Sequence, residues 1–103
     1  MDLKVFWTDT ALFQLEDIFE YYKVKASTKV AKTLAKKIID STIVLGHNPR
    51  IGQKEELLQN RKREYRYLIE GNYKIIYWIE DQYVKIASVF DCRQNPNKIE
   101  KIK

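Results

Sequence analysis

The stretch YRYLIEGNYKIIYWIEDQYVKIASVF, residues 65–90, decides the fold of this 103-residue chain. It holds three β-prone runs, at residues 65–69, 73–79 and 83–90, which are rich in tyrosine, isoleucine and valine. Gly71-Asn72 suits a tight turn with positive φ between the first two runs, and residues 80–82 turn the chain again. Connections this short force antiparallel pairing. The stretch therefore predicts a three-stranded antiparallel meander.

A strand and a helix open the chain. Residues 3–7 alternate and are β-prone, so they read as a short strand that joins the sheet at an edge or beside one of the later strands. Thr8 or Asp9 can then cap a helix, because apolar side chains recur at intervals of three and four over residues 11–22.

A second helix follows at once. Ser27 or Thr28 offers its cap, apolar positions repeat over residues 31–45, and Gly46, Asn48 and Pro49 are expected to end it. The short connection predicts an antiparallel helical hairpin on one face of the sheet. Residues 49–63 read as a loop with a helical turn near residues 55–58. The whole chain, residues 1–103, is expected to be a single α+β domain of order β-α-α-β-β-β.

Composition limits the classes of function. A net charge of +5 favours an acidic partner. The single Cys92 cannot form an intramolecular disulfide, and no apolar run approaches the ~20 residues that span a bilayer. We therefore expect a cytoplasmic protein without a membrane partner. One histidine and one cysteine make no zinc set, and no nucleotide-binding fingerprint is present, so we expect neither a metal nor a cofactor.

Basic residues gather before and within the meander. Arg61-Lys62-Arg63 and Arg66 lead from the loop into a strand, where they could contact phosphates, although a solvated loop explains them equally well. Arg93 stands just past the last strand. Its planar fork matches phosphate or carboxylate, but it could also be a surface ion-pair residue.

The middle strand of the meander is apolar on both faces. The set that contains Tyr73 and Tyr77 is expected to face the helices, and the set that contains Ile76 and Trp78 to lie on the other face. Another chain could cover that second face. Alternatively, Trp78 lies half-buried under the chain's own tail.

Several short motifs, in this order, resemble the RelE/ParE superfamily, the toxins of bacterial type II toxin–antitoxin (plasmid-stabilisation) modules. The resemblance covers nearly the whole chain. The pieces that carry it are Trp7-Thr8 with the helix through Tyr21-Tyr22, Asn48-Pro49, Tyr65-Arg66-Tyr67-Leu68, Gly71-Asn72-Tyr73-Lys74-Ile75-Ile76-Tyr77, and Asp91-Cys92-Arg93-Gln94-Asn95-Pro96.

The resemblance implies two activities on one scaffold. RelE-like members cleave mRNA on the ribosome as metal-free endoribonucleases, and ParE-like members inhibit DNA gyrase by binding. Under the first, the resemblance makes Arg66, Lys74 and Arg93 the catalytic cations on one basic surface. No histidine or tyrosine follows Arg93, however, so the tail departs from the nuclease pattern and favours a ParE-like toxin. A base for RNA cleavage would have to be Glu64, Glu70, Asp91 or Tyr65.

The same resemblance implies partners. The target is DNA gyrase or the ribosome with its mRNA, bound through Arg61, Lys62, Arg63, Arg66, Lys74 and Arg93. An acidic antitoxin is expected to wrap over the helical hairpin and to add a strand or helix to the sheet, with Leu12, Phe19, Ile76 and Trp78 as its contacts. A nontoxic binding module is the remaining alternative.

Overall fold

The computed structural model describes residues 2–58 and 62–93. The elements in chain order are β1 (Lys4–Trp7), α1 (Asp9–Lys25), α2 (Thr28–His47), β2 (Gln53–Lys54), the 3-10 helix η1 (Glu56–Leu58), β3 (Arg66–Glu70), β4 (Tyr73–Glu80) and β5 (Tyr83–Asp91). The predicted strand, helical hairpin and three-stranded meander are confirmed, as is the helical turn before the meander. The sequence does not predict β2, because two residues are too few to show an alternation.

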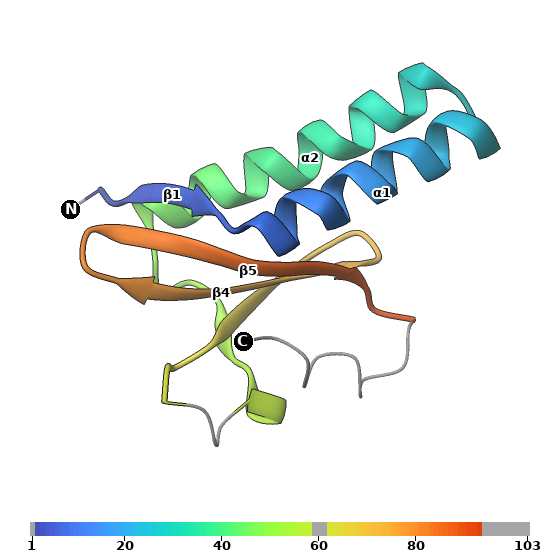
Figure 1. The fold of residues 1–103 in the computed structure, drawn as a ribbon. Helices are drawn as coiled ribbons and strands as arrows, with labels where there is room; N and C mark the ends of the chain where they lie inside the picture. The colour runs from blue at the N-terminus through green and yellow to red at the C-terminus, as the bar shows by residue number, and fades with distance from the viewer. Residues whose placement is uncertain (1, 59–61, 94–103) are drawn as a thin grey trace.

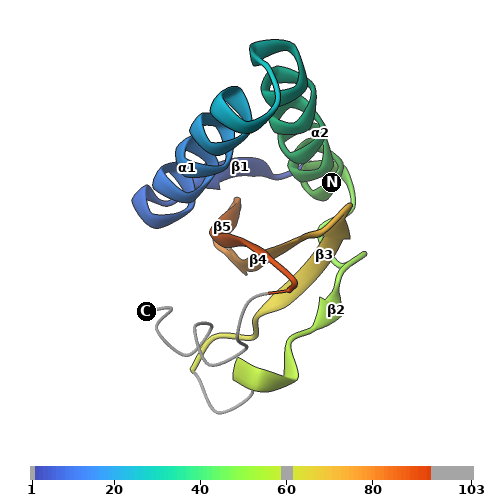
Figure 2. The ribbon, with the colours of Figure 1, turned by 90° about the vertical axis from the view of Figure 1, so that its right-hand side faces the viewer.

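The described strands form one mixed sheet in the order β1-β5-β4-β3-β2. The meander β3-β4-β5 is antiparallel, whereas β1 lies parallel to β5 with Lys4 opposite Tyr83 and Trp7 opposite Ile86. Both helices cover the same face of this sheet, and η1 lies on the opposite side (Figures 1 and 2). The N-terminal strand therefore closes the sheet at one edge, next to the last strand.

Both predicted turns are present. Gly71 adopts φ +58° between β3 and β4, and Asp81 adopts φ 56° between β4 and β5. Between Ile76 and Tyr77 the register of β4 against β5 shifts by one residue, so that Ala87 has no partner opposite it. Such a bulge increases the local twist of the sheet.

Side-chain caps start both helices. The Thr8 hydroxyl accepts a hydrogen bond from the Ala11 amide at 3.2 Å and donates one to the Ile86 carbonyl at 2.8 Å, so it also ties α1 to β5. Ser27 caps α2 through the Val30 amide.

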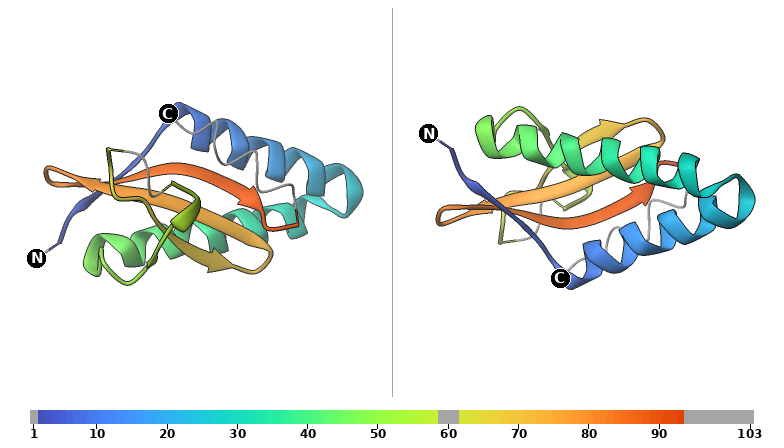
Figure 3. Two further views of the ribbon diagram at one scale, coloured as in Figure 1. Left: turned by 90° about the horizontal axis from the view of Figure 1, so that it is seen from below. Right: turned by 90° about the horizontal axis from the view of Figure 1, so that it is seen from above.

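The two helices run antiparallel across the sheet (Figure 3). None of the helices in the described residues is long and apolar enough to cross a bilayer.

Of the three residues predicted to end the second helix, Asn48 caps it as expected, but Gly46 lies within the helix, contrary to the prediction. The helix continues to His47, and Gly46 lies where α2 passes β1. A Cβ at this position would be 2.8 Å from the Leu3 carbonyl oxygen, and the Leu3 amide donates to the Gly46 carbonyl. The glycine therefore serves close packing between α2 and the N-terminal segment.

Apolar clusters occupy both faces of the sheet. The larger one lies between the helices and the sheet and includes Ala11, Ile38, Leu45, Tyr73, Ile75, Tyr77, Val84, Ile86 and Val89. The smaller one, on the opposite face, consists of Leu58, Tyr65, Ile76, Trp78 and Ala87, flanked by Tyr67 and Phe90. Each face of β4 thus has its own core, as the alternation along this strand predicts.

Candidate target-binding site

Arg66, the first residue of β3, is held by the loop that follows α2. Its guanidinium donates to the Gly52 carbonyl at 2.8 Å and to the Arg50 carbonyl at 3.5 Å, and it pairs with Glu64 at 2.8 Å. Only 15% of the side chain is exposed. Arg66 therefore fixes the loop to the sheet, and most of its donors are occupied.

Lys74 is engaged within the fold on the opposite face. Its ammonium pairs with Glu55, whose side chain is 4% exposed, and lies 4.2 Å from the centre of the Tyr67 ring. Arg66 stands opposite Tyr77 in the helix-side cluster, whereas Lys74 alternates with Ile76 toward the other cluster. The structure thus places Arg66 and Lys74 on different faces of the sheet rather than on one basic surface.

The cluster before β3 is described only in part. Arg61 lies outside the described residues. Lys62 is exposed, and the Arg63 guanidinium lies 4.4 Å from the centre of the Trp78 ring and 3.6 Å from Glu80. Arg63 therefore lies over the sheet face that carries Trp78.

The four suggested proton acceptors all have interactions within the fold. Glu64 pairs with Arg66, and Asp91 pairs with Arg93. Glu70 accepts a hydrogen bond from the Ser41 hydroxyl at 2.9 Å, and Tyr65 is buried edge-on against Trp78. The described residues also contain no group of three histidine, cysteine or acidic side chains placed to hold a metal ion.

Arg93 differs from Arg66 and Lys74, because its side chain is 66% exposed. Its Nε donates to both carboxylate oxygens of Asp91, at 2.8 and 3.1 Å, and the Arg93 backbone amide donates to the same carboxylate at 2.8 Å. Solvent screens this pair on the arginine side, so the guanidinium can also meet an anion of a partner. Among the three cations that the resemblance singles out, Arg93 is the one most accessible to a partner.

Arg93 borders a hollow of about 560 Å³ between α1 and the end of the sheet, which we call the Arg93 hollow. Gln14 fixes its wall, because the side-chain oxygen accepts hydrogen bonds from the Ser88 hydroxyl and the Val89 amide. Tyr21 on α1 is 56% exposed at its rim. The other polar residues that line it are Asp17, Tyr22, Tyr73 and Asp91.

Burial and hydrogen bonding set the charges in the Arg93 hollow. Burial raises the pKa of the Tyr73 hydroxyl well above its usual range, and a hydrogen bond with Tyr22 raises it further. Hydrogen bonds from Arg93 lower the pKa of Asp91, and the same pair raises the pKa of Arg93. At neutral pH the hollow therefore contains a neutral Tyr73 beside a fully charged pair, and Tyr73 is unsuited to accept a proton.

We expect Arg93→Met to raise the pKa of the Asp91 carboxyl toward the ordinary value of about 3.9. In the wild type the depressed pKa stabilises the folded chain above that ordinary value, and the contribution is lost as pH falls through the depressed pKa. Carboxyl ¹³C NMR titration measures both values. The Asp40 carboxyl serves as internal reference, because its partner Lys36 is unchanged. Equal Asp91 titration in both proteins would contradict the pairing in solution.

The four residues suggested as antitoxin contacts fall into two groups. Leu12 is 43% exposed, and Phe19 lines a shallow hollow between the helices together with Leu15 and Ala35. Ile76 and Trp78 are 0% and 7% exposed, so the prediction of an exposed apolar surface around Trp78 is wrong.

The chain itself covers this part of the sheet. Leu58 from η1 and Tyr65 from the segment before β3 pack on Ile76 and Trp78. The cover thus comes from the loop segment before the meander. The C-terminal tail, which the sequence also suggested as a cover, lies outside the described residues beyond Arg93.

The family model for the ParE toxin of the parDE type II toxin–antitoxin system matches residues 5–96, which is most of the chain. This chain belongs to the ParE toxin family. No curated protein sequence matches it.

Solved toxin structures share the fold of this ParE-family chain. The chromosomal ParDE system from P. aeruginosa superimposes with a TM-score of 0.72 at 16% identity, over 86% of this chain and 95% of that chain. The RelBE2 toxin–antitoxin complex from Mycobacterium tuberculosis superimposes with a TM-score of 0.60 at 19% identity, over 88% of this chain and 99% of that chain. A free-state double mutant of E. coli RelE superimposes with a TM-score of 0.56 at 17% identity, over 90% of this chain and 86% of that chain. Identities this low show the common fold alone, which both ParE and RelE proteins adopt.

Sequence reasoning for this ParE-family chain missed most of the Arg93 hollow. It named Arg93 but not Gln14, Tyr22 or Tyr73 as its neighbours. A partial signal was present, because Tyr21-Tyr22 lies on the first helix and Tyr73 begins a strand. Only the packing of α1 on β5 brings these segments together.

Proposed function

We propose that this type II toxin acts as a ParE-like inhibitor that binds DNA gyrase. One observation carries the choice between the two activities of the superfamily: Arg66 and Lys74 lie on different faces of the sheet, and each is paired with a carboxylate. Inhibition by binding needs no assembled catalytic set. The match to the ParE family model supports the same choice.

The alternative, ribosome-dependent mRNA cleavage, requires several catalytic groups to be assembled at one site. Cleavage without a metal needs a base for the 2′-hydroxyl, an acid for the leaving oxygen and cations around the phosphate. The suggested bases Glu64 and Asp91 are each paired with an arginine, and burial and Tyr22 keep Tyr73 neutral. Among the described residues the geometry therefore favours binding over catalysis.

A supercoiling assay with purified DNA gyrase tests this proposal. The purified toxin is expected to block supercoiling of relaxed plasmid, and its expression is expected to cause filamentation and the DNA-damage response. Normal supercoiling with excess folded toxin would rule the proposal out. Toeprinting on translating ribosomes tests the nuclease alternative in parallel, and harmless expression of folded protein would favour the nontoxic module.

We propose Arg93 as a target contact within this function. Arg93→Met is expected to weaken inhibition of gyrase about tenfold or more, as loss of an interfacial hot-spot arginine does. Arg93→Lys is expected to retain part of the inhibition that Arg93→Met loses, because lysine keeps the charge but lacks the planar guanidinium. The supercoiling assay measures both, and thermal unfolding checks the fold.

Lys29→Met is the matched control for Arg93→Met, because it also removes one exposed cation, on α2. Equal inhibition by the wild type and Arg93→Met would exclude Arg93 from the contact surface. A similar loss with Lys29→Met would show that only net charge matters.

We also propose an acidic antitoxin as the partner of the helical hairpin. The ParDE and RelBE2 structures come from toxin–antitoxin systems, which supports an antitoxin as a partner of this chain. On this chain, Leu12 and Phe19 offer apolar contact on α1, while Lys29 and Lys32 are exposed on α2. An amphipathic segment with acidic flanks complements both features.

A further inference from the structure

A second candidate contact surface lies on the sheet face away from the helices. Partnered residues of neighbouring strands point to the same face of a sheet. Phe6 on β1 stands opposite Lys85 on β5, which stands opposite Trp78 on β4. In the next row, Lys4 stands opposite Tyr83, which stands opposite Glu80. We call these two rows, together with Arg63, the Glu80 surface.

Glu80 is the centre of this surface. One carboxylate oxygen accepts a hydrogen bond from the Trp78 indole at 3.1 Å and lies 3.6 Å from Arg63, and the other accepts one from Lys85 at 2.9 Å. Hydrogen bonds from Lys85 and Trp78, in that order, lower the pKa of Glu80, so the carboxylate stays charged. Glu80 thus holds the side chains of Arg63 and Lys85 in place before any partner binds, which reduces the entropy lost on binding.

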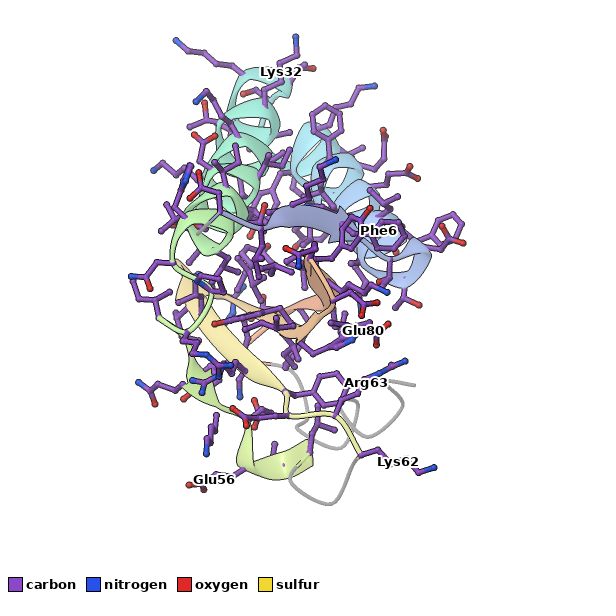
Figure 4. All side chains as sticks on the ribbon, turned by 90° about the vertical axis from the view of Figure 1, so that its left-hand side faces the viewer. Phe6, Lys32, Glu56, Lys62, Arg63 and Glu80 are labelled. Carbon is purple, nitrogen blue, oxygen red and sulfur yellow. The ribbon has the colours of Figure 1, made fainter. Side chains whose placement is uncertain are left out.

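Exposed aromatic rings lie beside one of these cations, Lys85. Phe6 is 50% exposed and Tyr83 38%, and their rings meet edge to face with centroids 6.5 Å apart. The Lys85 ammonium lies 5.9 Å from the centre of the Phe6 ring. Figure 4 shows Phe6, Glu80 and Arg63 one below another along this flank, far from Lys32 on the helices. Aromatic residues and arginine are enriched in interface hot spots, and the arginine of this surface, Arg63, lies over the Trp78 ring.

Charge indicates the kind of partner. Among the described residues that define the surface, the charged side chains are Lys4, Arg63, Glu80 and Lys85, so the surface is positive overall. Glu80 lies among the cations, however, and Asp81 follows it in the turn. A nucleic-acid backbone would bring its phosphates against both carboxylates, whereas a protein can place its acidic side chains over the cations alone. The surface therefore suits an acidic protein that seats an apolar side chain on Phe6 and Tyr83.

We infer that the Glu80 surface is where this toxin contacts its protein target, an acidic patch of DNA gyrase. The inference rests on the proposed function and deepens it by adding a contact surface separate from the helical hairpin. The surface includes residues from β1, β4, β5 and the segment before β3, so it exists only in the folded chain. The exposed aromatic pair supplies the apolar anchor, and the fixed cations supply the orientation.

Two single variants test the inference in the supercoiling assay. Phe6→Ala removes the exposed ring, and Lys4→Glu reverses an exposed charge in the same surface. Each is expected to raise the toxin concentration for half-inhibition about tenfold. The matched controls are Phe13→Ala, a ring that is 64% exposed on α1, and Lys37→Glu, an exposed lysine on α2. The controls are expected to stay within twofold of the wild type.

Each outcome decides something different. If the wild type does not inhibit gyrase, the proposed function fails, and this inference fails with it. If the wild type inhibits and the Phe6 and Lys4 variants match their controls, only the inference is overturned. Thermal unfolding identifies any variant that fails to fold, and Tyr83→Ala then replaces Phe6→Ala.

Fluorescence anisotropy with a labelled single-stranded 20-mer tests nucleic acid, the other class of ligand. Micromolar binding that Phe6→Ala abolishes, without an effect on gyrase inhibition, would reassign the surface to nucleic acid.

Discussion

Lys74→Met is expected to destabilise this toxin by about 3–5 kcal/mol, the usual cost of leaving a buried charge without its partner. Glu55 is 5% exposed, and its Oε2 accepts no hydrogen bond within the described residues, so the Lys74 ammonium is what compensates its burial. Within the described residues, the other oxygen, Oε1, accepts a hydrogen bond from the Leu57 amide at 3.2 Å. Urea unfolding followed by far-ultraviolet circular dichroism measures the change in the free energy of unfolding.

A second substitution separates charge from packing. In the double variant Lys74→Met/Glu55→Gln no buried charge remains, and the new side-chain amide oxygen at position 55 would still accept from the Leu57 amide, so most of the lost stability is expected to return. Lys36→Met is the matched control, because its pair with Asp40 is 76% and 53% exposed and contributes about 0–1 kcal/mol. If Lys74→Met cost no more than Lys36→Met, the buried pair would not form in solution.

Gly52→Ala is expected to cost about 2–5 kcal/mol, from overpacking and from the loss of buried hydrogen bonds. The Tyr77 hydroxyl is fully buried, donates to the Pro49 carbonyl at 2.8 Å and accepts from the Gly52 amide at 2.9 Å. A Cβ on Gly52 would overlap this hydroxyl and lie 2.7 Å from the backbone oxygen of Tyr67. The loop would have to move away from the sheet, and Arg66 would lose its acceptor at Gly52.

Tyr77→Phe completes a double-mutant cycle for this position. Alone it removes the hydroxyl and is expected to cost about 1–3 kcal/mol, because the Gly52 amide and the Pro49 carbonyl lose their partner. Combined with Gly52→Ala it also removes the tightest of the three steric overlaps, leaving those with the Tyr67 carbonyl oxygen and the ring of residue 77. The double variant is therefore expected to be more stable than the sum of the single effects predicts. Strict additivity in urea unfolding would show that the hydroxyl and residue 52 do not meet.

The elements that sequence reasoning located are those with a local cause. Thr8 and Ser27 cap their helices because a short polar side chain reaches an amide three residues ahead, and both were among the predicted caps. Gly71 turns the chain because glycine accepts a positive φ at little cost. The two faces of β4 follow from strand alternation. Each of these features depends on residues close together in the chain.

The roles of the polar residues in the site depend on contacts that no local pattern encodes. The partner of Lys74 is Glu55, from a loop segment without periodicity, and the acceptors of Arg66 are carbonyl groups at residues 50 and 52. A cation that holds a loop and a cation that binds a target look alike in the sequence. Only burial distinguishes them, since Lys74 and Arg66 are mostly covered while Arg93 is not.

The pairing of β1 with β5 affects when this toxin can fold during its synthesis. The first strand hydrogen-bonds the last. The Thr8 hydroxyl donates a hydrogen bond to the Ala87 carbonyl, which lies 79 positions later in the chain. Contacts so distant along the chain slow folding, because a long loop must close before they form. A nascent polypeptide has no partner for β1 until β5 has been synthesised, so the strand that carries Phe6 stays unpaired until then.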